Sequence, residues 1–493
     1  MTGHVKGVSR HQVVLLPDRL DDYVDEENPV RFIDAFVNHL NLKIHGFKHA
    51  EPMATGRPPY DPSDLLKLYI YGYLNQLRSS RRLEKECKRN VEVMWLMGRL
   101  TPDFKTIADF RRDNAGCIKA VFRELIKVCG SLGLFGAEII GVDGSKFKAV
   151  NSKKRHYTVE KLTEAQSRVE KRITGYLEML EANDQVEDDE QRRGDSEGRA
   201  ESLRDKIAKL EERRRELHMV ENLMGETGQK EVSLTDPDSR LMKDHGRFDI
   251  GYNVRTAVDS KNKLIAEYDV SNVCPDQGQL SGVAVAAMKT LGVDHIEALG
   301  DKGFYSRMDI KKCLDNGVKP YVPEPKADAV GPVKKTGIPS PEYRIEKFTY
   351  DKESDSYICP AGQILTFRRW TKTLYGKRMG VYATDACHDC PFYLTECTRS
   401  KKGRILFRWE HEEVVEELRT RMMSPEGVEK MGLRKQLCEH PFGSIKRWHN
   451  HGFLLLKGLG RVTGEIGLTL LAYNMIRAIN LVGVGALVAS VAR

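Results

Sequence analysis

The first quarter of the chain repeats apolar residues at helical spacing. The stretch LLKLYIYGYLNQL follows a polar break, EPMATGRPPYDPSD, whose Asp or Ser can cap a helix. The next stretch, SSRRLEKECKRNVEVMWLMG, gathers its apolar residues on one helical face. After the turn LTPDF, the helical pattern resumes in KTIADFRRDNAGCIKAVFRELIKVCGSLG. The pattern predicts a helical N-terminal domain over residues 1–130.

Residues 155–230 are dense in charged residues, and their apolar residues recur only sparsely. The apolar positions are Leu162, Val169, Ile173, Leu177 and Leu180, then Leu203, Ile207 and Leu210. Between these two groups lies an acidic, glycine-containing break, ANDQVEDDEQRRGDSEG. This spacing predicts a helical hairpin or short coiled coil that serves as an arm or an oligomer contact. A charged spacer is the plainer alternative.

Strand patterns occupy residues 131–154 and 231–325. An apolar run, AEIIGVD, comes first, and alternating or β-branched residues in FDIGYNVRTAVDSKNKLIAEYDVS then flank the turn DSKNK. DQGQLSGVAVAAMKTLGV has the pattern of a helix and HIEALGD that of a strand. The order of these elements predicts an α/β core with a mixed sheet, to which residues 409–493 add C-terminal helices.

Three separated acids are the candidate chemistry of this core. Asp143 and Asp301 each close an apolar run and precede a glycine-containing turn, and Glu439 follows on a helical stretch. Carboxylates at the ends of core strands are held rigidly and reach one edge of a sheet. Mg²⁺ or Mn²⁺ takes oxygen ligands and needs few of them from the protein when phosphates complete its shell. The acids therefore suit two-metal phosphoryl transfer, although an Asp beside Gly is often only a turn residue.

The third acid has rivals in the same helical region. They are Glu412, Glu413, Glu416, Glu417, Glu426 and Glu429. Glu439 is preferred because Phe442, Ile445 and Trp448 give it a packed helix with basic neighbours. A clustered run such as HEEVVEEL is more typical of a solvated face.

Charge favours a polyanionic partner. The chain has 493 residues, with 79 Lys plus Arg and a formal net charge of +8. In the N-terminal domain the basic residues Arg81, Arg82, Lys85, Lys88 and Arg89 lie largely away from the apolar face of their helix. A basic face beside short helix–turn–helix connections could grip DNA, and an ordinary solvated face would have the same pattern.

Four of the ten cysteines lie close together in residues 326–408. They are Cys359, Cys387, Cys390 and Cys397, so a CxxC pair is followed by one cysteine and preceded by another across a long loop. Four thiolates can close a tetrahedral structural Zn²⁺ site, and His388 could replace one of them. A redox pair is disfavoured, because no thioredoxin-like strand and helix surround the CxxC.

The remaining features point to the cytoplasm. The other cysteines are isolated, as is usual in a reducing compartment, and MTGHVKGVSRHQ lacks the apolar core of a signal peptide. The apolar run from Leu481 to Val491 is too short to span a bilayer and predicts a packed helix. We therefore expect no membrane partner.

The chain resembles the DDE transposases of bacterial insertion sequences that have a ribonuclease H-like core. The strings that carry the likeness begin with GRPPYDPSDLLKLYIYGYLNQLRSSRRLEKECKRNVEVMWLMG and PDFKTIADFRRDN. They continue with DGSKFKAVNS, DPDSRLM, GYNVRTAVD, LGDKGFYS, CEHPFGSIKRW and LLAYNMIRAINL. The likeness is collinear and spans nearly the whole chain.

The resemblance implies roles for individual residues. Asp143, Asp301 and Glu439 resemble the three metal-binding acids, with Mg²⁺ or Mn²⁺ as cofactor. Arg434, Lys446 and Arg447 stand where relatives handle DNA phosphates. Lys446 shares a helical face with Glu439 if the helix is unbroken.

Two residues depart from the family pattern and affect the roles that the resemblance implies. Met431 occupies the place of a tyrosine that many relatives have, which puts the tyrosine-dependent part of the pattern in doubt. Pro441 must lie in the first turn of its helix or bend it.

The resemblance also implies an activity. A transposase of this kind binds the terminal inverted repeats, cuts DNA and transfers the freed 3′-hydroxyl to target DNA, as a homo-oligomer in a synaptic complex associated with the bacterial nucleoid. The alternatives are a ribonuclease H-like nuclease without strand transfer and a catalytically inactive DNA-binding derivative.

Overall fold

The computed structural model describes residues 19–51, 58–152, 155–186, 193–244, 246–325, 339–373, 377–448 and 451–492. Two compact units make up the chain. Unit 1 takes Met1–Gly136, Asp143–Cys274 and Leu437–Arg493, and unit 2 takes Ala137–Val142 and Pro275–Gln436. Strand β1 (Ile139–Lys148) and helix α12 (Pro425–Gly443) contribute residues to both units.

The N-terminal part of unit 1 is helical, as the apolar spacing predicts. Its helices are η1 (Leu20–Tyr23), α1 (Pro29–His39), α2 (Pro62–Leu74), α3 (Ser80–Arg89), α4 (Val91–Leu96), α5 (Phe104–Asn114), η2 (Ala115–Cys117) and α6 (Ile118–Ser131). Asn28, Asp61, Asn90 and Asp103 each accept a backbone N–H at a helix start. Residues 52–57 of the predicted polar break lie outside the described residues, and Asp61 is the cap that ends it.

Helix α13 (Leu459–Val491) is the core helix of unit 1 and packs against α1, α2 and α6. Among the described helices it alone is long and apolar enough to cross a membrane by length and composition. Most residues from Val462 to Met475 are inaccessible in unit 1, whereas the apolar 18-residue window that meets this test is 33% buried. The run after Leu481 is helical as predicted and buries Val484, Leu487 and Val491 beyond a kink at Gly483.

The strands of unit 1 include the predicted hairpin. β5 (Arg247–Asp259) pairs in antiparallel fashion with β6 (Ile265–Ser271), and earlier residues of β5 pair with β4 (Arg240–Asp244). The second half of β1 runs beside β5, where Ala149 N donates to Ile250 O at 3.0 Å.

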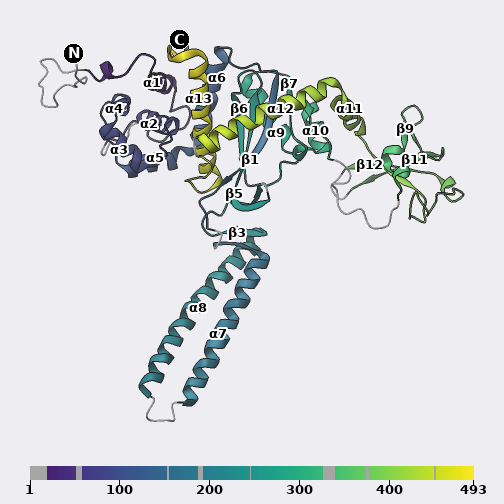
Figure 1. Ribbon diagram of the computed structural model, residues 1–493, viewed down its shortest axis with the longest axis horizontal. Coiled ribbons are helices and arrows are strands. Elements are labelled where there is room, and N and C mark those ends of the chain that lie inside the picture. The colour runs from purple at the N-terminus through teal and green to yellow at the C-terminus, as the bar shows by residue number, and fades with distance from the viewer. Residues whose placement is uncertain are drawn as a thin grey trace, which may run out of the picture. The chain divides into compact units, whose positions relative to one another are not determined.

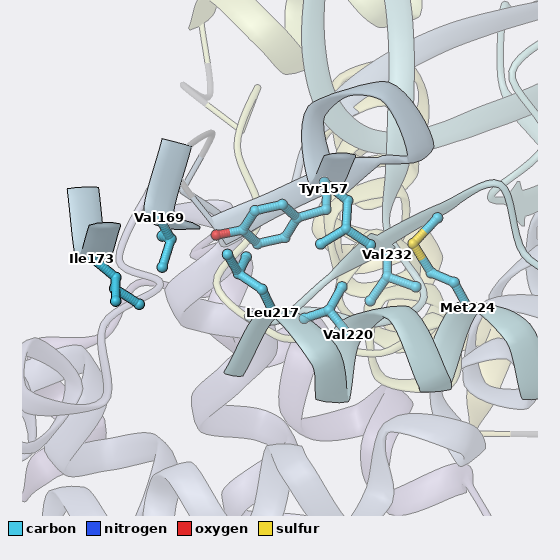
Figure 2. Close-up of a cluster of buried hydrophobic side chains, with 8 residues drawn as sticks. Tyr157, Val169, Ile173, Leu217, Val220, Met224 and Val232 are labelled. Atoms are coloured by element: carbon cyan, nitrogen blue, oxygen red, sulfur yellow. The ribbon is translucent and has the colours of Figure 1, made fainter. Parts of the chain in front are cut away.

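Unit 1 also contains a long pair of helices. Helices α7 (Val159–Val186) and α8 (Arg193–Thr227) run side by side from the small sheet of β2 (His156–Thr158) and β3 (Glu231–Ser233) (Figure 1). Their buried cluster lies at the base, where Tyr157 and Val232 of the sheet join side chains from both helices (Figure 2). The sparse apolar spacing therefore corresponds to two helices whose core is concentrated at the sheet.

Unit 2 contains a parallel set of strands. The first half of β1 pairs with β7 (Ile296–Leu299), which pairs with β8 (Val318–Tyr321). Helices α9 (Leu280–Leu291) and α10 (Arg307–Asp315) pack against each other and α9 contacts both β7 and β8. Strand β8 was not predicted, because its four residues are too few to show a strand pattern in the sequence.

The second part of unit 2 is a five-stranded antiparallel sheet. Its order is β13-β12-β11-β10-β9. The strands are β9 (Thr349–Asp351), β10 (Ser356–Ile358), β11 (Ile364–Lys372), β12 (Arg378–Ala383) and β13 (Ile405–Trp409), and helix α11 (Glu412–Met423) leads on to α12. Short 3-10 turns lie at Lys302–Phe304, Pro341–Tyr343, Ile345–Lys347 and Asp385–Cys387. The molecule is therefore of the mixed α/β class, as predicted.

Candidate active site

Asp143 lies in the middle of β1, so the prediction that it ends a strand is wrong. The strand continues through Gly144 to Lys148 because it finds a new neighbour in β5. Gly251 of β5 permits this approach, since a Cβ there would collide with the carbonyl of Phe147. The half-buried carboxylate of Asp143 accepts the N–H of Gly144 at 2.9 Å.

Asp301 follows β7 and begins a turn, as predicted. It is the N-cap of the 3-10 turn Lys302–Phe304 and accepts the N–H of Gly303 at 2.8 Å. Its side chain is 44% exposed, and Arg434 Nη2 lies 3.9 Å from its Oδ2. In unit 2, Arg434 therefore faces the second predicted acid.

The first part of α12 is tied to the parallel strands of unit 2 by charge. Lys430 Nζ lies 2.5 Å and Lys319 Nζ 2.9 Å from the carboxylate of Glu297 on β7. Glu426 accepts from Tyr321 Oη at 2.5 Å. Burial opposes the ionisation of Glu297, but the hydrogen bonds from Lys430 and Lys319 outweigh it and lower the pKa of that carboxyl.

Glu439 belongs to unit 1, near the end of α12. Its side chain is exposed, while Leu437, Cys438 and Phe442 are buried. Phe442 packs against Phe147 of β1 with ring centroids 6.3 Å apart. Within the described residues, Glu439 has no ion pair or side-chain hydrogen bond.

The rival acids divide into two groups. Glu412, Glu416 and Glu426 are held by Arg307, Arg408 and Tyr321, at 2.7, 2.6 and 2.5 Å respectively. Glu413 lies 3.8 Å from His411. Glu417 and Glu429 are exposed, as Glu439 is. Ion pairs or hydrogen bonds therefore set four of the rival acids apart from Glu439, and two, Glu417 and Glu429, have neither among the described residues.

Pro441 does not lie in the first turn of its helix. It stands inside α12, two residues before the end, and a π-helical segment, Ser444–Trp448, follows at once. Because proline cannot donate the hydrogen bond to the preceding turn, the regular α-helical ladder is interrupted here. Glu439 and Lys446 consequently do not share one uninterrupted α-helical face, which was the condition for pairing them.

The basic residues after Glu439 differ in what they contact. Lys446 Nζ donates to Lys146 O on β1 at 2.8 Å and lies 5.0 Å from the centre of the Phe147 ring. Arg447 is exposed. Lys446 thus braces β1, and Arg447 faces solvent.

The predicted basic face of α3 is partly engaged by neighbours. Lys88 pairs with Glu84 at 2.8 Å, Arg89 pairs with Glu86 at 2.5 Å, and the Arg81 guanidinium lies over the Phe104 ring. The exposed side chains of Arg82 and Lys85 have no ion pair among the described residues. These two are the residues best placed to meet an external anion.

A buried ionic cluster in unit 1 was not predicted. The carboxylate of Glu465 is 1% exposed, accepts the N–H of Leu456 at 2.8 Å and lies 3.6 Å from Arg78 Nη1. Arg78 also donates to Phe453 O at 2.8 Å. Since Leu454 N donates to Lys148 O at 2.8 Å, the cluster connects the start of α3 with the end of β1. A single glutamate in an apolar helix, LGRVTGEIGLTLLAYN, was the signal that could have found it.

No group of three or more His, Cys, Asp or Glu side chains among the described residues is arranged to hold a metal ion. All ten cysteines are free thiols. The three acids and the four clustered cysteines are therefore candidates by donor chemistry and position.

A mixed α/β core beside a helical N-terminal region is the architecture that the resemblance to DDE transposases implies. Family comparisons agree with it. A family described as "Transposase domain (DUF772)" matches residues 18–113, and one described as "Transposase DDE domain" matches residues 358–479. The chain is a DDE-type transposase of insertion sequences. The second match contains Glu439 but neither aspartate, and no curated protein matches the chain.

Proposed function

We propose that this transposase cuts DNA at transposon ends and joins the freed 3′-hydroxyl to target DNA, with Asp143, Asp301 and Glu439 as its catalytic acids. The observation that carries the proposal is the register of two parallel strands. Ile139, Ile140 and Gly141 pair with Glu297, Ala298 and Leu299. Two residues beyond the last pair, strand β1 reaches Asp143, and the segment that follows β7 reaches Asp301.

Helix α12 supports Glu439 as the third acid. In unit 2 the helix brings Arg434 to Asp301, and five residues later it carries Glu439. In unit 1 the next turn packs Phe442 against Phe147, four residues after Asp143. Within unit 2 the helix therefore lies beside Asp301, and within unit 1 its end packs on β1.

The donor set fits Mg²⁺ or Mn²⁺. Three carboxylates supply hard oxygen ligands, and none of them is buried. When bound, such ions lower the pKa of an attacking water and stabilise the leaving oxygen of a phosphodiester. Arg434 beside Asp301 would attract the DNA phosphate and limit the repulsion between that phosphate and the carboxylate.

We further propose a ribonuclease H-like core, supported by the parallel β1, β7 and β8 and the antiparallel β5 and β6. The N-terminal helices would hold the inverted repeats, with Arg82, Lys85 and Arg447 as exposed phosphate contacts. Joining two ends requires more than one copy, so we propose a homo-oligomeric synaptic complex acting on nucleoid DNA in the cytoplasm.

The test is cleavage and joining of a DNA end by the purified chain with Mg²⁺ or Mn²⁺. Asp143→Asn, Asp301→Asn and Glu439→Gln should each lower single-turnover cleavage by at least about 100-fold, equivalent to about 2.7 kcal/mol. End binding, measured by gel shift, should stay unchanged. Glu429→Gln is the matched control, because this exposed acid lies on the same helix, and it should cleave normally.

Full cleavage by any one of the three variants would overturn its assignment. Loss of cleavage in Glu429→Gln but not in Glu439→Gln would move the third acid to Glu429. Cut ends without a joined product would indicate a nuclease. End binding without metal-dependent cleavage by the unaltered chain would indicate an inactive DNA-binding derivative.

A further inference from the structure

The cysteine-bearing sheet of unit 2 packs two of its cysteines against a buried cluster. Among the described residues, this cluster is formed by Phe348, Tyr357, Leu365, Tyr382 and Leu406, and Cys359 and Cys397 pack against it. Small modules commonly depend on a cross-link or a metal for stability.

Two cysteines of this module sit in turns of the same kind. Cys359 Sγ accepts the N–H of Gln363 at 3.2 Å, directly after Gly362 at φ +81°. Cys387 Sγ accepts the N–H of Arg404 at 3.4 Å, and the residue before Arg404 is again a glycine with positive φ. Each turn therefore fixes the position of its sulfur by a backbone hydrogen bond.

Gly403 shows how closely the backbone approaches the second of these sulfurs. Its φ is +80°, and an added Cβ would lie 3.0 Å from Cys387 Cβ and 3.3 Å from Cys387 Sγ. Any side chain at this position would therefore crowd the cysteine as well as strain the backbone. Glycine at position 403 is therefore what lets the backbone pass this close to Cys387.

The two remaining cysteines lie beside these turns. Cys390 N donates to Cys387 O at 3.2 Å, which closes the CxxC turn, and Arg404 Nη1 donates to Cys397 O at 3.4 Å. Arg404 therefore joins the turn of Cys387 to that of Cys397, and Cys359 packs against the same apolar cluster as Cys397.

We propose that Cys359, Cys387, Cys390 and Cys397 bind one structural Zn²⁺ that holds the sheet of unit 2 together. Four thiolates are the usual closed ligand set for zinc, and two of them already receive backbone hydrogen bonds. The sulfurs are not gathered around a common point in this structure, so binding requires the side chains to turn toward one another. The exposed His388, beside the CxxC, has its ring 5.2 Å from that of Tyr393 and is not required.

The experiment measures metal content in the full-length chain purified without added chelator. We expect one zinc per chain by elemental analysis. Replacing zinc with Co²⁺ should give a thiolate-to-cobalt charge-transfer band and the intense visible absorption of tetrahedral coordination. This spectrum needs no variant, so it tests the site even where a substitution prevents folding.

Single variants then identify the ligands. Each of Cys359→Ser, Cys387→Ser, Cys390→Ser and Cys397→Ser should lose zinc or bind it at least about tenfold more weakly. Gly403→Ala should weaken binding while leaving all four sulfurs present. Cys274→Ser is the matched control, because Cys274 is another half-buried free thiol of this chain, and it should keep its zinc.

Several results would overturn the proposal. They are a chain without zinc that also takes up no Co²⁺, zinc that survives all four serine variants, or mass spectrometry showing that these cysteines form disulfides. If His388→Ala loses zinc while one of the cysteine variants keeps it, His388 is the ligand in place of that cysteine. DNA cleavage plays no part in these measurements, so their outcome is independent of the proposed catalytic acids.

Discussion

Two glutamates with basic partners, one in each unit, respond to their surroundings in opposite ways. Glu465 of unit 1 is 1% exposed, and burial raises the pKa of its carboxyl despite Arg111 and Arg78 nearby. Glu297 of unit 2 is 22% exposed, and Lys430 and Lys319 lower its pKa. In the deeper cluster desolvation decides the direction of the pKa shift, whereas in the shallower cluster ion pairing decides it.

The largest effect is expected from breaking the buried cluster at Arg78. Arg78→Met should lower the free energy of unfolding by about 3 to 5 kcal/mol, because it leaves the Glu465 charge buried without this partner. It also removes the hydrogen bond to Phe453 O and the stacking on the Phe453 ring. Urea unfolding measures the loss. Arg82→Met, an exposed arginine nearby, should change stability by less than about 0.5 kcal/mol.

If Arg78→Met lowers the free energy of unfolding as little as Arg82→Met does, the buried cluster contributes nothing to stability. The contrast between Glu465 and Glu297 would then have no energetic consequence.

A smaller effect is expected from Glu465→Gln, and its signature is pH dependence. The amide keeps an oxygen for Leu455 and Leu456 N–H, so the loss should be about 1 to 3 kcal/mol. Since the folded pKa of Glu465 is raised, its contribution to stability is fully present below the ordinary value of 4.5 and is lost as pH rises through the folded pKa. The stability of the unaltered chain minus that of Glu465→Gln should therefore fall as pH increases above 4.5. A difference that grows with pH would contradict the assignment.

The smallest effect is expected from Lys430→Met in unit 2. Glu297 keeps Lys319 and partial access to water, so the loss should be about 1 kcal/mol. Because the folded pKa of Glu297 is lowered, its contribution is present above 4.5 and is lost as pH falls through the folded pKa. The stability difference from the unaltered chain should therefore shrink in acid, opposite to Glu465→Gln. Differential scanning fluorimetry across pH compares the two variants directly. Stability differences that change with pH in the same direction in both variants would contradict the predicted contrast.

Much of the fold follows from local patterns. The helical N-terminal region, the β5–β6 hairpin and the paired helices α7 and α8 were predicted because their apolar spacing reports the period of each element. Asp301 was also predicted correctly as a turn residue after a strand. Short elements such as β8 were missed, since four residues of strand carry little periodicity.

The candidate site was predicted less completely. Asp143 was expected at a strand end because Gly144 follows it, yet β1 continues when β5 supplies new backbone partners. Pro441 was expected either in the first turn of its helix or at a bend, and it lies inside α12 shortly before a π-helical segment. The error at Asp143 has a physical cause, which is that hydrogen bonding to a distant part of the chain overrides the local preference of a single residue.

The sequence by itself determined the class of protein, the order of its three candidate acids and the grouping of its four cysteines, because residue identity and spacing carry that information. Only the tertiary structure decided which partners the charged side chains have. It pairs Arg434 with Asp301, engages Glu426 with Tyr321 and buries Glu465 beside Arg78. The physical reason is that desolvation and ion pairing depend on neighbours hundreds of residues away, such as Arg78 and Glu465, and local sequence does not encode them.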